Sequence, residues 1–100
     1  MNNKDLDSLL AKKEFRQLFE MYPFCIDVLR DYSLPISGVC IKPIQENIAT
    51  GSQFSYDSGF NYFSNIIKKQ DIYIDFFDIW RDNEDRDTEI TFYIPEARQC

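Results

Sequence analysis

The chain has 100 residues, with 17 acids, 11 bases and no histidine, and its formal net charge is −6. This length allows one domain with a modest core that needs neither disulfide bonds nor a metal. The lack of histidine removes the commonest general base and the commonest metal ligand of proteins. We therefore expect a single domain over residues 1–100 that is neither an enzyme nor a metalloprotein.

The sequence predicts a cytoplasmic protein. Its N-terminus is polar and charged and lacks the apolar core of a signal peptide. No run reaches the ~18 uncharged apolar residues that a membrane helix requires, so no membrane contact is expected. An odd number of cysteines without metal-ligand spacing is typical of a reduced chain. Cys25 and Cys40 have apolar neighbours and are expected in the core, whereas Cys100 is terminal.

Residues 4–32 have a helical pattern, because apolar side chains recur at i, i+3 and i+4 in two successive groups. Pro23 interrupts the run, and proline is tolerated in a first helical turn but not inside a helix. The sequence therefore predicts two helices joined at this proline and ended by residues 33–35. The apolar positions of the first helix are Leu6, Leu9, Leu10, Phe15, Leu18 and Phe19.

Short strands are predicted after the helices. The segment Ile36–Ile44 is rich in β-branched residues, and Pro43 within it favours an edge strand because proline cannot donate to a neighbouring strand. Residues 45–52 are predicted as a loop or as a frayed strand around residues 48–50. Phe54 and Tyr56 alternate with polar neighbours, which predicts a second brief strand.

A third helix is predicted from Asp57 or Ser58 to about Gln70. The cations Lys68 and Lys69 would suit its C-terminal end, where the helix dipole is negative. The apolar face of this helix would consist of Phe60, Phe63, Ile66 and Ile67.

Residues 71–82 fit two structures. A helix would align four aspartates in one acidic stripe. A strand is favoured because β-branched and aromatic residues lose rotamer freedom in helices, and because Thr88–Ile94 also alternates and would pair with it as a hairpin. As a strand, it places Ile72, Ile74, Phe76 and Trp80 on one face and Tyr73, Asp75, Phe77 and Ile79 on the other.

The predicted fold is therefore α+β. Two N-terminal helices and a third, central helix would pack on one face of a small antiparallel sheet that ends in a C-terminal β-hairpin.

The negative charge is concentrated in the second half of the chain. Residues 1–50 carry seven acids and six bases, whereas residues 51–100 carry ten acids and five bases, so the net charge changes from −1 to −5. Eight of those ten acids lie between Asp71 and Glu89. This distribution favours a basic protein partner over direct nucleic-acid binding, because phosphates are bound by Lys and Arg. Solubility alone also accounts for an acidic surface, and that alternative stays open.

No motif indicates a catalytic, cofactor or metal site. The chain has no glycine-rich phosphate loop and no nucleophile elbow, and the acidic loop DNEDRD lacks the D-x-D-x-D-G order of a calcium loop. We expect neither catalytic residues nor a cofactor.

The predicted functional feature is a surface that combines acids with large aromatic rings, the composition of binding hot spots. It predicts a small acidic inhibitor of the immunity-protein or antitoxin type that blocks a basic partner such as a nuclease toxin. The alternatives are a phage anti-defence protein that mimics nucleic acid and a non-catalytic oligomeric or regulatory subunit. We expect a monomer or a small homo-oligomer. The predicted partner-binding residues are Tyr73, Asp75, Phe77, Asp78, Trp80, Asp82, Glu84, Asp85 and Asp87.

Overall fold

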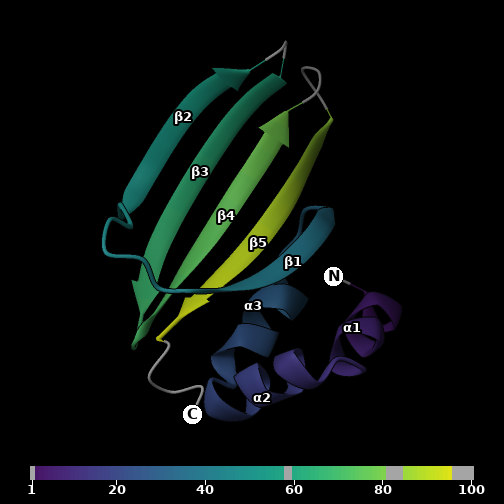
Figure 1. Cartoon of the computed structure of the whole chain (residues 1–100). Coiled ribbons are helices and arrows are strands. Elements are labelled where there is room, and N and C mark those ends of the chain that lie inside the picture. Colours follow the sequence, from purple (N-terminus) through teal and green to yellow (C-terminus); the bar gives the residue numbers. More distant parts are fainter. Residues whose placement is uncertain (1, 58–59, 81–84, 96–100) are drawn as a thin grey trace. The chain divides into compact units, whose positions relative to one another are not determined.

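The computed structural model describes residues 2–57, 60–80 and 85–95. The chain divides into two compact units, Met1–Leu34 and Pro35–Cys100. The first unit contains helices and the second contains a β-sheet, so the chain is α+β, as predicted (Figure 1).

The N-terminal unit has one helix more than predicted. The apolar spacing explains the break, because Leu10 and Phe15 are five residues apart and cannot continue one helical stripe. The Asn2 side chain caps the start of the first helix by accepting a hydrogen bond from the Asp5 N–H at 2.9 Å. Lys12 then has extended backbone and immediately precedes the second helix. The helices are α1 (Asn3–Leu10), α2 (Lys13–Met21) and α3 (Phe24–Asp31).

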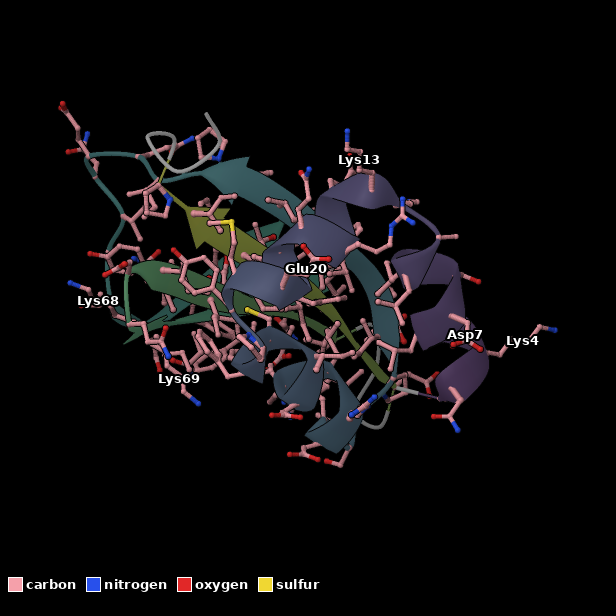
Figure 2. All side chains as sticks on the ribbon, turned by 90° about the horizontal axis from the view of Figure 1, so that it is seen from below. Lys4, Asp7, Lys13, Glu20, Lys68 and Lys69 are labelled. Atoms are coloured by element: carbon pink, nitrogen blue, oxygen red, sulfur yellow. The ribbon has the colours of Figure 1, made fainter. Side chains whose placement is uncertain are left out.

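The helical unit buries apolar side chains from each of its helices. Pro23 separates α2 from α3 as predicted, and the Phe15 and Phe19 rings of α2 lie 6.2 Å apart. Lys4 and Lys13 extend outward from α1 and α2 (Figure 2). None of the described helices has the length and apolar character needed to cross a membrane. The buried side chains are Leu6, Phe15, Leu18, Phe19, Tyr22, Cys25 and Leu29.

The second unit is a five-stranded sheet with the order β1-β5-β4-β3-β2 (Figure 1). β1 is parallel to β5, and the other neighbours are antiparallel. The prediction of an antiparallel sheet is therefore wrong for β1, which is far from β5 in the sequence, so that no hairpin turn forces the two strands to be antiparallel. The strands predicted over 36–44, around 54–56, over 71–82 and over 88–94 are present, and β1 lies at an edge of the described sheet. The bounds are β1 (Ile36–Pro43), β2 (Gly51–Asp57), β3 (Phe60–Lys69), β4 (Ile72–Trp80) and β5 (Arg86–Ile94).

The prediction of a helix over residues 57–70 is wrong, because residues 60–69 form β3. Two adjacent apolar residues can share one face of a helix, but they can also fill both faces of a strand. Here Ile66 and Ile67 turn to opposite faces of the sheet. Asn61, Ser64 and Asn65 favour helices poorly, because their side chains compete for backbone hydrogen bonds. Pairing with strands on both sides decides the outcome: Ser64 lies opposite Gln53 of β2 and opposite Phe77 of β4.

The alternation along β4 and β5 gives the sheet two different faces. One, here called the buried face, contains a cluster of fully or almost fully buried apolar side chains: Ile72, Ile74, Ile90, Phe92 and Ile94. The other, here called the half-exposed face, contains Tyr62, Ser64, Ile66, Lys68, Tyr73, Asp75, Phe77, Ile79, Asp87, Glu89, Thr91, Tyr93, Cys40 and Lys42. The predicted division of β4 and β5 into two faces is therefore confirmed. That the helices pack on one face stays a prediction.

The turn between β3 and β4 has two residues, Gln70 and Asp71, because Lys69 pairs directly with Ile72. Gln70 has a φ of 58°, as two-residue hairpin turns require at their first central position. A β-branched side chain is strained at positive φ.

Replacing Gln70 by Val should therefore lower the free energy of unfolding by about 1–2 kcal/mol, as measured by urea denaturation. Gln70→Gly is the control, since glycine adopts this φ without strain. Equal stability of the valine and glycine variants would contradict the turn geometry.

Candidate binding face of the sheet

The register of the strands arranges the half-exposed face in rows. Residues that lie directly opposite in neighbouring strands project to the same side of a sheet. Asp75 of β4 is therefore at the centre of the face, between Ile66 of β3 and Thr91 of β5. The other rows, each read from β3 through β4 to β5, are Tyr62–Ile79–Asp87, Ser64–Phe77–Glu89 and Lys68–Tyr73–Tyr93.

Charge differs between the two ends of this face. Asp87 and Glu89 lie toward the start of β5, and the exposed Asp85 comes just before that strand. The opposite end carries Lys68, whose ammonium lies 5.8 Å from the centre of the Tyr73 ring, and Lys42. Lys68 and its neighbour Lys69 leave the end of β3 in different directions (Figure 2), as alternation along a strand requires. A charged partner would therefore bind in a preferred orientation.

Aromatic rings lie in the rows on both sides of Asp75. The rings of Tyr62 and Phe77 stack with centroids 5.2 Å apart and planes 19° apart. Tyr73 of β4 and Tyr93 of β5 lie directly opposite each other. Such pairs hold the rings in place, so less side-chain freedom is lost when a partner covers them.

Asp75 lies in a surface hollow of about 310 Å³ on this face. The Ser64 hydroxyl donates a hydrogen bond of 2.5 Å to its Oδ1 atom. Burial raises the pKa of the Asp75 carboxyl above its ordinary value, and the negative charge of Asp78 raises it further. The hydrogen bond from Ser64 and the positive charge of Lys42 both lower this pKa, but burial is the largest effect. The hollow is lined by Gln53, Phe54, Ser55, Ser64, Ile66, Asp75 and Phe77.

The structure brings only part of the predicted partner-binding set together. Tyr73, Asp75, Phe77 and Asp87 share the half-exposed face, and Asp85 lies beside it. Two further predicted residues, Asp82 and Glu84, lie outside the described residues.

The remaining two predicted residues, Asp78 and Trp80, lie on the opposite side of β4. Asp78 is only 4% exposed, and it accepts hydrogen bonds of 2.8 Å from both the Thr88 hydroxyl and the Arg86 guanidinium. Trp80 is 40% exposed and has the Arg86 guanidinium 5.6 Å from its ring centre. Asp78 therefore forms a structural ion pair with Arg86 and does not lie on the half-exposed face.

Sequence reasoning missed Tyr62 and Ser64, because it assigned their strand to a helix. No local alternation could have found them, because residues 61–66 (NYFSNI) do not alternate between polar and apolar side chains. Cys40 was expected in the core but is exposed, because it lies on edge strand β1 with its neighbours Val39 and Ile41 turned to the other face. Cys25 is buried, as predicted.

The described residues contain no group of three or more His, Cys, Asp or Glu side chains that could hold a metal ion. Comparison with protein-family models, with curated proteins and with solved structures finds no significant match to the chain.

Replacing Asp78 by Ala should lower the free energy of unfolding by about 2 kcal/mol, because Thr88 and Arg86 lose their shared acceptor and a buried hydroxyl is left without it. Partial exposure of Arg86 keeps the loss below that of a fully buried pair. Urea denaturation measures the effect. The control Asp85→Ala removes an exposed carboxylate and should change stability by less than ~0.5 kcal/mol. Equal effects of the two substitutions would contradict the structural role of Asp78.

Asp75→Asn should make the protein more stable at neutral pH. Because the pKa of Asp75 is raised in the fold, the unfolded chain loses this proton at a lower pH than the folded chain does. Stability therefore declines as the pH rises from the ordinary aspartate pKa of 3.8 to the raised value, and it stays lower above it.

Thermal unfolding of the Asp75→Asn variant and of the unchanged chain, followed from pH 7 down to pH ~3.5, tests this expectation. The gain in melting temperature should shrink as the pH falls. A variant that is less stable than the unchanged chain at pH 7 would show that the carboxylate stabilises the fold.

Proposed function

We propose that the chain is a small acidic binding protein of the immunity-protein or antitoxin type, which blocks a basic partner such as a nuclease toxin. It acts by contact rather than by catalysis. The observation that carries the proposal is the half-exposed face, where acids and fixed aromatic rings share one side of a sheet.

The composition of this face supports a protein partner. Tyr62, Tyr73, Phe77 and Tyr93 are partly accessible rings, and aromatic anchors supply much of the binding energy in protein interfaces. Carboxylates near such anchors speed the encounter with a basic surface and oppose acidic partners.

Mimicry of nucleic acid fits the face less well. A mimic needs carboxylates in a continuous array that follows the spacing of phosphates. Here Asp75, Asp87 and Glu89 share the face with Lys42 and Lys68, and rings separate the charges. A discrete basic site on a protein is the better match.

A non-catalytic subunit that assembles with its own copies is a second candidate. It is favoured by Phe54, which is 51% exposed on β2, the last strand of the described sheet on that side. Light scattering on the purified chain separates the two candidates: a dimer that resists dilution favours the subunit, and a monomer favours the inhibitor.

Affinity capture from the source cells, followed by binding kinetics with the recovered protein, tests the proposal. The double variant Asp85→Asn/Glu89→Gln removes two exposed charges at the acidic end of the face. It should slow association several-fold at low ionic strength and flatten the salt dependence, because steering depends on local charge.

The matched control is Asp27→Asn/Asp31→Asn, which removes two exposed charges from α3. The control should associate as the unchanged chain does. If both double variants slow association equally, net charge rather than this face steers the partner, and the proposal fails.

A further inference from the structure

We propose that the hollow beside Asp75 binds the guanidinium group of an arginine side chain supplied by the partner. This inference rests on the proposed function, since it names the group of the basic partner that the half-exposed face would hold. It makes Asp75, rather than the more exposed acids, the centre of recognition.

Within the described part of the chain, the Asp75 carboxylate is incompletely paired. Among the described residues, Ser64 is its hydrogen-bond donor, and that bond uses Oδ1. Lys42 acts on it through charge and forms no ion pair with it within the described part of the chain. A half-buried carboxylate with little compensation gains more from an incoming cation than a fully solvated one does.

An aromatic ring in the lining of the hollow favours a planar donor. Phe77 lines the hollow and is held by its stack on Tyr62. A guanidinium is planar, stacks on aromatic rings and keeps weak hydration, whereas an ammonium is a compact and strongly hydrated charge. A ring beside a carboxylate therefore selects arginine over lysine.

The rest of the lining fits the same side chain. Ile66 offers an apolar surface to the three methylenes of an arginine. The amide of Gln53 and the hydroxyl of Ser55 offer oxygen acceptors to the guanidinium N–H groups that Asp75 leaves unpaired. The volume of about 310 Å³ is near the lower limit of ligand pockets, which are roughly 300–1,000 Å³. It suits one side chain better than a large metabolite.

Titration of the isotope-labelled chain with N-acetyl-arginine amide, followed by amide and side-chain NMR, tests the inference without the partner. We expect saturating shifts at Ser64, Asp75 and Phe77. Asp75→Asn keeps the size and the acceptor for Ser64 but removes the charge, so it should weaken binding about tenfold or more. Asp27→Asn removes one exposed charge from α3 and should leave binding unchanged.

Each other outcome overturns the inference. Absence of saturating shifts shows that the hollow does not bind the group. Equal binding of N-acetyl-lysine amide shows that guanidinium is not selected, and equal weakening by Asp27→Asn shows a general effect of charge. In all three cases the proposed function still stands or fails on the kinetics of the Asp85→Asn/Glu89→Gln variant, so the two failures are distinguishable.

Discussion

The register between β4 and β5 is the constraint on which the rest of the sheet depends. Asp78 and Thr88 are opposite each other in the two strands, and their side chains are joined by a 2.8 Å hydrogen bond on the buried face. A shift of one residue would exchange every side chain of β4 between the faces and would place Asp75 among buried isoleucines. The polar pair therefore holds the alignment that also sets Asp75, Phe77 and Tyr73 on the half-exposed face. In this way the buried Asp78 carboxylate determines that the Asp75 carboxylate lies on the half-exposed face.

The two aspartates of β4 illustrate opposite uses of one chemical group. Asp78 accepts hydrogen bonds from Thr88 and Arg86 and stabilises the sheet. Asp75 accepts a hydrogen bond from Ser64 and has a raised pKa, which means that its charged form opposes folding. A group kept at a cost in stability is typical of functional positions, where stability and function are in conflict. The proposed function gives that cost a reason, because a cation from a partner would stabilise the charge that the fold leaves incompletely paired.

Much of the sheet could be predicted from the sequence, because alternation over 72–80 and 88–94 assigns each residue to a face. The same alternation places Asp78 beside Ile74 and Phe76, yet charge pattern alone grouped it with the exposed acids. Burial of a carboxylate depends on Thr88 and Arg86, which reach it only through strand pairing. The strand over 60–69 could not be recognised locally, since adjacent isoleucines fit a helix as well as a strand and the decision lies in pairing with β2 and β4. Without that strand, Ser64 and the hollow beside Asp75 could not be predicted.

The central claim is that the half-exposed face of the sheet binds a basic protein. Hydroxyl-radical footprinting of the chain alone and of its complex with the captured partner tests it most directly, because aromatic side chains report their own accessibility. Tyr62, Tyr73, Phe77 and Tyr93 should be oxidised more slowly in the complex, whereas Tyr32, which follows α3, should react at the same rate in both. Protection confined to the helical unit, with the four rings of the sheet unchanged, would contradict the account.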